Sequence, residues 1–285
     1  MAKYKDIVGT AIRNNAGNIP TAETGQIFFD STNLDFKYQQ PNATTAASWS
    51  TAASMNTARA YNFATAGDKT AALNFGGNEP PGAVSGKTEL WNGASWTEVN
   101  DLNDTRGGNA GCGTTTSALS TGGSSPGDTA NTETWNGTSW TEVNNLNTAR
   151  DRLAAAGEDN EAALAFGGGP SALTETWDGT SWTEVNDMNT YHQSGGSGGT
   201  SSGFGLGFGG DSQIPPGATR TANTESWNGT SWTEVNNMGT GRMDLNYGYI
   251  GTGSNSMALG GDTPPYVATT ETFTADLANK TITAT

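Results

Sequence analysis

The sequence has little of what several protein classes require. One cysteine, Cys112, and one histidine, His192, exclude an internal disulfide and a zinc site built from Cys and His. Lysine and arginine number 13 against 28 Asp and Glu, and the net charge of −15 argues against nucleic acid as a partner. No long apolar run occurs, and none follows the N-terminal lysines, so we expect neither membrane insertion nor a secretory signal. We also expect no metal and no cofactor.

Leucine, isoleucine and valine are scarce too, and few aliphatic residues combined with a high net charge are typical of disordered chains. Nine tryptophans argue instead for a folded protein, and all nine belong to an internal repeat. Its four full copies are TELWNGASWTEVNDLN at 88–103, TETWNGTSWTEVNNLN at 132–147, TETWDGTSWTEVNDMN at 174–189 and TESWNGTSWTEVNNMG at 224–239.

Partial copies extend the repeat at both ends. ASWSTAASMNTAR at 47–59 corresponds to the last part of a copy, and TETF at 270–273 corresponds to the first part of another. A second marker is a pair of glycines that precedes each copy. The pairs are Gly76-Gly77, Gly122-Gly123, Gly167-Gly168, Gly209-Gly210 and Gly260-Gly261. Five pairs indicate five structural units.

Each repeat has room for four short strands. In the third copy we expect strands at 150–156, 161–166, 174–177 and 181–185, with a tight turn at Asp178-Gly179 between the last two. No segment of useful length has helical periodicity. A four-stranded antiparallel unit of roughly 40–50 residues that recurs around an axis is typical of a β-propeller blade. The sequence therefore predicts an all-β fold containing a five-bladed β-propeller.

The two partial copies predict how the ring closes. The last copy lacks a fourth strand, and 48–51, around Trp49, can supply it to the sheet built from 242–273. Within each blade the two tryptophans should pair or lie diagonally across the hairpin and pack between neighbouring blades. Residues 1–42 lie outside the repeat, and we expect two strands there, at 26–30 and 35–38. This divides the chain into an N-terminal segment, 1–42, and the propeller, 43–285.

The loops between the second and third strands vary in length and carry most of the prolines. Variable loops on a rigid scaffold are common binding sites, and stiff loops lose less entropy when they bind. The candidate contact residues on these loops are Pro81, Gln213, Arg220, Pro265 and Tyr266. The alternative is that the loops vary because nothing constrains them.

Charged residues recur at fixed repeat positions. Glutamates in the third and fourth strands could suggest glycoside hydrolysis, but a residue identical in every blade more readily serves the fold than catalysis. One position holds a cation in four blades and a histidine in the other. Its residues are Arg59, Arg106, Arg150, His192 and Arg242. They could form an anion-binding ring, and the favoured alternative is that each arginine pairs with a glutamate or with backbone carbonyls.

The Gly-Gly pair followed by two spaced aromatic residues resembles the kelch repeat, over about residues 45–275. The two tryptophans are closer together here than the kelch aromatics, and five blades are fewer than usual for kelch. The sequence motif ETWNGTSWTEVN, together with NTAR, resembles the repeats of proteins encoded by marine tailed phages. In the N-terminal segment, GQIFFDSTN resembles a hairpin found in phage tail-fibre and other virion proteins.

The resemblance implies a non-enzymatic structural protein of a phage virion, as a tail fibre or a capsid appendage. We expect residues 1–42 to bind other virion proteins or further copies of the chain, and the propeller to bind a host-surface glycan or protein. Two alternatives stay open. One is a purely structural decoration of the capsid or tail that binds only virion proteins, and the other is a propeller hydrolase or lyase that acts on polysaccharide.

Overall fold

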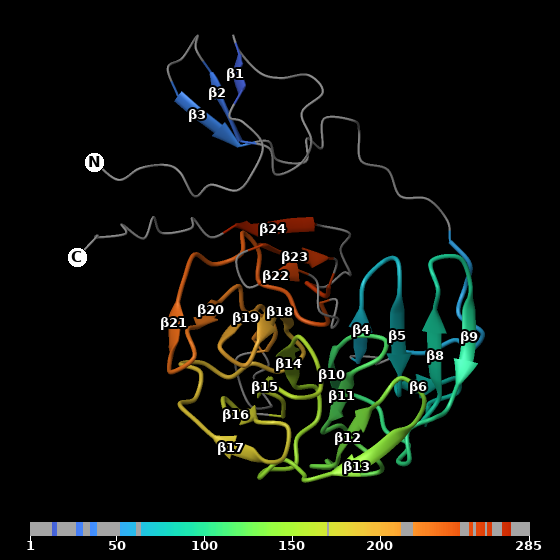
Figure 1. The fold of residues 1–285 in the computed structure, drawn as a ribbon. Coiled ribbons are helices and arrows are strands. Elements are labelled where there is room, and N and C mark those ends of the chain that lie inside the picture. The colour runs from blue at the N-terminus through green and yellow to red at the C-terminus, as the bar shows by residue number, and fades with distance from the viewer. Residues whose placement is uncertain are drawn as a thin grey trace. The chain divides into compact units, whose positions relative to one another are not determined.

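The computed structural model contains β-strands and, among the residues it describes, no helix (Figure 1). Accordingly, no helical segment in that part of the chain could span a membrane. The described residues are 13–15, 27–30, 35–38, 52–60, 64–169, 171–211, 219–245, 251–252, 255–259, 261–263 and 270–274. By its contacts the chain divides into two compact units, Met1–Thr51 and Ala52–Thr285. The predicted boundary between residues 42 and 43 lies outside the described residues.

The second unit contains four four-stranded antiparallel sheets with identical strand order. Sheet 1 consists of β4 (Thr65–Gly67), β5 (Ala72–Phe75), β8 (Thr88–Trp91) and β9 (Trp96–Val99). Sheet 2 consists of β10 (Ala110–Gly113), β11 (Ala118–Thr121), β12 (Thr132–Trp135) and β13 (Trp140–Val143). Sheet 3 consists of β14 (Ala154–Gly157), β15 (Ala163–Phe166), β16 (Thr174–Trp177) and β17 (Trp182–Glu184). Sheet 4 consists of β18 (Gly196–Ser201), β19 (Phe204–Phe208), β20 (Thr224–Trp227) and β21 (Trp232–Glu234).

A fifth sheet has the same form with three strands in the described part of the chain. Sheet 5 consists of β22 (Gly251–Thr252), β23 (Asn255–Leu259) and β24 (Thr270–Thr274). The predicted closing strand, 48–51, lies outside the described residues. The all-β prediction and the prediction of repeated four-stranded antiparallel units are confirmed, and five sheets of blade-like form are consistent with a propeller.

The hairpin between the third and fourth strands forms because its turn is stabilised locally. In sheet 2, Asn136 Oδ1 accepts hydrogen bonds of 2.9 Å from the backbone N–H groups of Thr138 and Ser139. Gly137 adopts a φ of 91°, which a residue with a side chain rarely does. The turn fixes the register, so Trp135 lies directly opposite Trp140 with 5.3 Å between ring centroids. The predicted pairing of tryptophans is confirmed.

The core lies between successive sheets. The first strands of neighbouring sheets, such as β10 and β14, contact one another, and Figure 1 shows the fourth strands at the periphery. Trp140 of sheet 2 packs against Phe75 of sheet 1, with 4.7 Å between ring centroids, and buried Leu102 belongs to the same cluster. Burial of these aromatic rings replaces much of the apolar area that leucine and isoleucine usually supply.

Two further features differ from the sequence-based expectations. The first strand of sheet 3 begins at Ala154 rather than at Arg150, because Arg152 has a φ of 51°, which no β-strand contains. In the N-terminal unit the predicted hairpin is present as β2 (Ile27–Asp30) and β3 (Asp35–Tyr38). A parallel strand, β1 (Arg13–Asn15), joins it and was not predicted.

A small additional hairpin occupies the first variable loop. It consists of β6 (Asn78–Glu79) and β7 (Ala83–Val84), and it leads back to β8 of sheet 1. Its tip, which contains Pro81, is exposed. This loop is therefore an ordered part of the surface that carries the connections from second to third strands.

Candidate functional site

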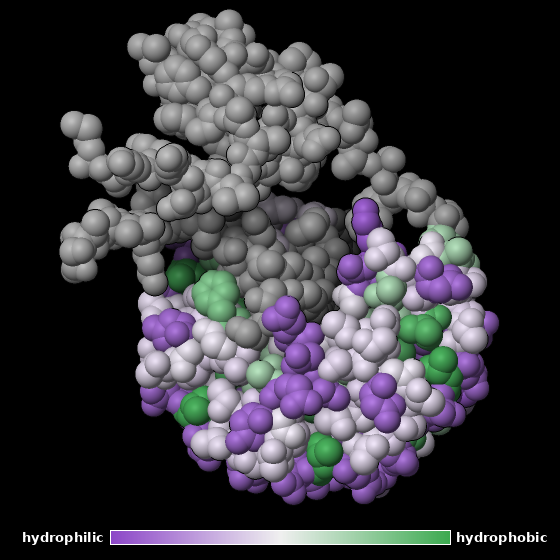
Figure 2. All heavy atoms as spheres, in the orientation of Figure 1, coloured by the Kyte–Doolittle hydropathy of each residue, from purple (hydrophilic) through white to green (hydrophobic). Residues whose placement is uncertain are grey.

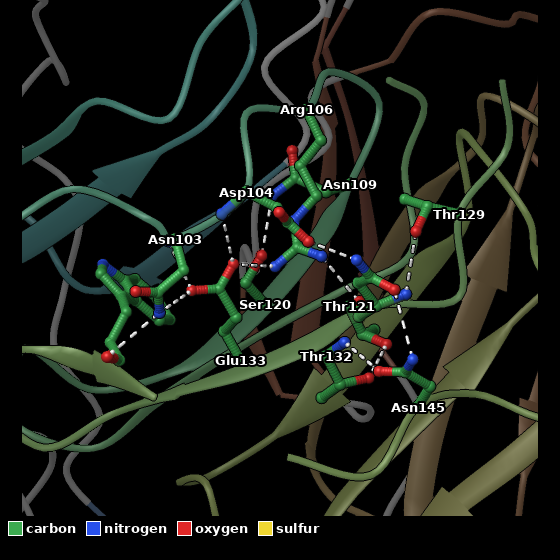
Figure 3. Close-up of polar contacts among 12 residues, drawn as sticks. Asn103, Asp104, Arg106, Asn109, Ser120, Thr121, Thr129, Thr132, Glu133 and Asn145 are labelled. Carbon is green, nitrogen blue, oxygen red and sulfur yellow. Dashed lines mark hydrogen bonds and ion pairs between the residues drawn. The ribbon is translucent and has the colours of Figure 1, made fainter. Parts of the chain in front are cut away.

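The recurring arginine and glutamate form a buried contact between a sheet and the segment that enters it. In Figure 3, Arg106 from the segment that enters sheet 2 lies beside Glu133 of β12, with 2.8 Å between Arg106 Nη2 and Glu133 Oε1. The other carboxylate oxygen accepts hydrogen bonds of 2.8 Å from the backbone N–H and the amide of Asn103. Both charged side chains are fully buried. The pair thus holds the segment that enters sheet 2 against the sheet, while Arg106 Nε is buried without a hydrogen-bond partner.

Three other sheets repeat this contact. The ion pairs are Arg59–Glu89 at 2.7 Å, Arg150–Glu175 at 2.9 Å and Arg242–Glu271 at 2.7 Å. Arg59, Arg106 and Arg150 also donate to backbone carbonyls. Burial lowers the pKa of Arg150, and Glu175 opposes that shift. The structure places these four guanidinium groups on carboxylates, and anion binding by the predicted ring stays a prediction.

His192 occupies the arginine position in sheet 4 and makes a different set of contacts. Its ring is buried and stacks on Phe166, with 5.8 Å between centroids. Burial lowers the pKa of His192 to about 4, and nearby Glu225 acts in the opposite direction. Glu225 is buried, and among the described residues no cation forms an ion pair with it. Instead, Thr190 donates to Glu225 from its backbone N–H at 3.0 Å and from its hydroxyl at 2.8 Å.

The residues two positions after the recurring arginine, or after His192, are linked by backbone hydrogen bonds. These bonds connect sheets 2 to 5 in series. Arg152 N–H donates to Gly108 O at 2.7 Å, Ser194 N–H to Arg152 O at 3.2 Å, and Asp244 N–H to Ser194 O at 2.9 Å. All four residues have φ between 50° and 68°, which is unfavourable for the three that carry side chains. We call these four residues the backbone collar. The collar position holds a different residue in each of these four sheets.

A polar recess of about 310 Å³ lies beside the collar and is lined by three consecutive sheets. Its walls come from the loops after second strands and from the segments that precede first strands, which lie at the same end of an antiparallel unit. We call this end the loop face. The lining residues are Asn78, Val84, Gly107, Gly108, Ser124, Asp151 and Arg152. At Gly107 an added Cβ would overlap Asn78 Oδ1, so only glycine leaves room for the Asn78 side chain.

The recess contains groups of both charges and an unused acceptor. Arg152 Nε lies 3.2 Å from Asp151 Oδ2, and the Arg152 side chain is about half exposed, at 46%. Burial raises the pKa of the Asp151 carboxyl, Arg152 opposes the rise and Asp128 adds to it. Asn78 Oδ1 is buried without a hydrogen-bond partner. The site can therefore accept hydrogen bonds from a ligand and donate hydrogen bonds to it, while carrying little net charge.

The predicted loop residues have different surroundings. Arg220 is largely occupied, because its Nη2 lies 2.6 Å from Asp262 Oδ2 and its Nε donates to Asp262 O at 3.1 Å. This pair connects the loops of sheets 4 and 5. Pro81 stands exposed at the tip of the first loop. Gln213, Pro265 and Tyr266 lie outside the described residues.

Sequence reasoning placed Asn78 in a candidate binding loop, 78–87, without singling it out, and it missed Asp151 and Arg152. A signal for the last two was present, because the pair that follows the arginine position reads Gly-Gly, Asp-Arg, Gln-Ser and Met-Asp in sheets 2 to 5. This pair changes chemistry from sheet to sheet, whereas the position before it holds arginine in three of these four sheets. The other candidates contribute little to a site. Cys112 is buried in β10, which raises its thiol pKa to about 12, and the described residues contain no cluster of metal-ligating side chains.

No protein-family model matches this chain, and no curated protein matches it as a relative.

Proposed function

We propose that this protein is a non-enzymatic component of a phage virion whose loop face binds a neutral, polyhydroxylated ligand of the host surface, such as a sugar. The observation that carries the proposal is the recess, where Asp151, Arg152 and Asn78 supply acceptors and donors side by side. Sugar hydroxyls both donate and accept hydrogen bonds, so a site with both functions and little net charge suits them. A strongly charged ligand would pair with one of the two charged side chains, Asp151 or Arg152, and leave the other without a counter-ion.

The distribution of polar groups supports recognition by this face. The third-strand glutamates of sheets 1 to 4 are buried in contacts with arginine or threonine and are closed to a ligand, whereas Glu271 of sheet 5 is partly exposed. Within the described surface in Figure 2, hydrophobic residues form small scattered groups among neutral and hydrophilic ones, which favours polar over apolar contacts on the face shown. The residues of the collar and of the recess, which differ from sheet to sheet, lie at the loop face.

The recess also bears on the hydrolase alternative. Glycoside hydrolysis by the common mechanisms requires two carboxyl groups on either side of the scissile bond. Among the described lining residues, Asp151 is the single carboxylate, and Arg152 pairs with it. This supports binding without turnover.

The proposed scaffold is a five-bladed β-propeller, with sheets 1 to 5 as blades and the strand near Trp49 closing the ring. The backbone collar supports it, because the collar passes from sheet 2 to the segment that enters sheet 5 through equivalent hydrogen bonds. The corresponding residue of sheet 1 is Tyr61, outside the described residues. Residues 1–42 would attach the propeller to other virion proteins.

A glycan array and a cell-adsorption assay with the full chain test the function. We expect Asp151→Asn and Arg152→Ala each to weaken binding by about tenfold or more, which corresponds to one good hydrogen bond to a charged group. Glu142→Gln and Lys69→Ala remove exposed charges away from the loop face and should leave binding unchanged. Equal binding by all four variants would overturn the assignment of the recess. Absence of the protein from purified particles, tested by immunogold electron microscopy, would overturn the virion assignment.

A further inference from the structure

A second polar pocket, of about 200 Å³, lies next to the recess on the loop face. Its walls are the segment that enters sheet 2 and the loop after the second strand of that sheet. The same two segments supply Gly107 and Ser124 to the recess. We call this second pocket the Asp104 pocket, and its lining residues are Asp104, Thr105, Arg106, Ser125, Thr129 and Asn131.

The boundary between the Asp104 pocket and the recess is made of backbone. Gly107 N–H donates to Ser124 O at 3.2 Å, and Ser124 N–H donates to Gly107 O at 2.8 Å. Gly107 and Gly108 have no side chain to stand between the two pockets, and the side chain of Arg106 is directed to Glu133. The equivalent pairs of sheets 3 to 5 all carry side chains, and they are Asp151-Arg152, Gln193-Ser194 and Met243-Asp244. Among sheets 2 to 5, sheet 2 alone therefore keeps this boundary free of side chains from the entering segment.

Asp104 is the residue by which the pocket departs from the repeat. Asp104 lies beside Arg106 (Figure 3), but that guanidinium contacts Glu133, and the Asp104 carboxylate accepts a hydrogen bond from Asn131 Nδ2. Within the described part of the chain, no donor reaches its other oxygen. The other four copies of the repeat hold threonine at this position, as Thr57, Thr148, Thr190 and Thr240. The repeated fold does not require an aspartate here, so the carboxylate is a candidate for a ligand contact.

The hydroxyl groups of the Asp104 pocket are available as well. Thr129 Oγ1 accepts a hydrogen bond of 3.1 Å from Asn131 N–H and keeps its own hydrogen for another acceptor. Thr105 is exposed and Ser125 is half-buried, and neither hydroxyl is bonded to any residue that the structure describes. The pocket therefore presents a free carboxylate oxygen together with three hydroxyls, which suits the hydroxyls of a sugar unit.

We propose that the ligand of the loop face is a linear, neutral oligosaccharide, with one sugar unit in the recess and the next in the Asp104 pocket. This rests on the proposed function and extends it from a sugar to a chain of sugars. Small-molecule sites usually enclose about 300–1,000 Å³, so the 200 Å³ pocket extends the 310 Å³ recess and does not form a site alone.

The charge of the Asp104 pocket selects a neutral chain. Glu133 neutralises Arg106, so the carboxylate of Asp104 gives the pocket a net negative charge. An acidic sugar in this position would be repelled by a like charge. The recess tolerates neutral units for the reason given above, so neither pocket favours an acidic chain.

A comparison of ligand lengths in the full chain tests the second pocket. The probes are a neutral disaccharide that the chain binds on the glycan array and its component monosaccharides, titrated by calorimetry. We expect the disaccharide to bind about tenfold or more tightly than either monosaccharide. Asp104→Thr introduces the residue of the other four copies, which the fold accommodates there. It should remove most of that gain and leave the affinity for the monosaccharides unchanged.

Asp178→Asn is the matched control. It removes the same charge, and it too introduces the residue of the other full copies, where Asn92, Asn136 and Asn228 stand. Asp178 lies in the turn between third and fourth strands, at the opposite end of the sheet from the loop face. This variant should bind the disaccharide and the monosaccharides as the native chain does.

A disaccharide that contains a uronic acid provides a second readout. It should bind the native chain more weakly than the neutral disaccharide, and Asp104→Thr should narrow the difference. A native preference for the acidic probe would overturn the proposal. So would equal affinities for disaccharide and monosaccharide, or equal effects of Asp104→Thr and Asp178→Asn, and in both cases the proposed function would stand if Asp151→Asn still weakened binding. If the native chain bound no sugar of the array, the proposed function would fail and this inference with it.

Discussion

The carboxylate of Glu225 accepts a 2.8 Å hydrogen bond from the hydroxyl of Thr190 in the sheet where histidine replaces the recurring arginine. In sheets 2 and 3 an arginine guanidinium reaches the equivalent carboxylate oxygen at 2.8 and 2.9 Å. A buried carboxylate needs either a counter-ion or several hydrogen bonds. In sheet 4, hydrogen bonds therefore compensate the buried charge of the carboxylate, as the ion pair with arginine does in sheets 2 and 3.

The first prediction concerns Thr190→Val, which keeps the shape of the side chain and removes the hydroxyl. Glu225 then loses one donor without gaining a cation, so the free energy of unfolding should fall by about 1–3 kcal/mol. Thr148→Val is the matched control, because Thr148 stands at the same position in sheet 3, where Arg150 contacts Glu175. Urea denaturation of both variants measures the difference. An equal loss in both would show that the hydroxyl is not specific to the Glu225 contact.

The second prediction concerns the pH dependence of stability. The pKa of His192 is about 4 in the folded chain and about 6.5 in the unfolded chain. Below pH 6.5 the unfolded chain binds a proton that the folded chain does not, so the free energy of unfolding falls as pH falls from about 6.5 to 4. The full loss from this group is about 3 kcal/mol.

The variant His192→Gln isolates that contribution, because His192 is the single histidine of the chain. As the pH falls from 7 to 4.5, we expect the unfolding free energy of the variant to fall less than that of the native chain. Denaturation series at several pH values measure it, and the carboxylates contribute similarly to both proteins. A difference that is constant with pH would contradict the lowered pKa.

The third prediction concerns the buried ion pair between Arg106 and Glu133. Glu133→Gln leaves the guanidinium of Arg106 buried without a counter-ion, and breaking one side of such a pair costs about 3–5 kcal/mol. Glu142→Gln changes the exposed residue directly opposite on β13 and should leave stability almost unchanged. Thermal unfolding compares the two. If Arg106 instead served mainly as an anion site, stability would fall little and added phosphate would change it.

Local features of the fold could be predicted from the sequence because the hairpin is short and its turn is self-contained. Asn136-Gly137 fixes the register of Trp135 and Trp140 without help from distant residues, and the repeat copies that solution in sheets 1 to 4, with Asp178 in place of asparagine in sheet 3. The choice between an anion ring and an Arg–Glu pair could not be made in the same way. It depends on burial, and burial of Arg106 and Glu133 arises only when the segment entering sheet 2 packs on that sheet.

The recess could not be predicted because no single stretch of the sequence forms it. Three sheets contribute the lining residues Asn78, Ser124 and Asp151, and none of these residues belongs to the repeated sequence motif. They are brought together by the packing of neighbouring sheets, which buries tryptophan and leucine between them. Likewise the φ of Arg152 is imposed by its backbone hydrogen bond to Gly108, which lies in another sheet.

The fourth prediction concerns Gly107→Ala at the floor of the recess. An added Cβ overlaps Asn78 Oδ1, so the Asn78 side chain must move. Because the atom that the new Cβ meets is the free end of a side chain that can rotate away, we expect a small loss of stability, and displacement of the amide should weaken ligand binding by about tenfold. Gly127→Ala is the control, because its Cβ meets no atom within 4 Å and the residue is exposed. Denaturation and a binding titration of both variants separate the two effects. Lost stability with unchanged binding would remove Asn78 from the proposed ligand contacts and leave them to Asp151 and Arg152.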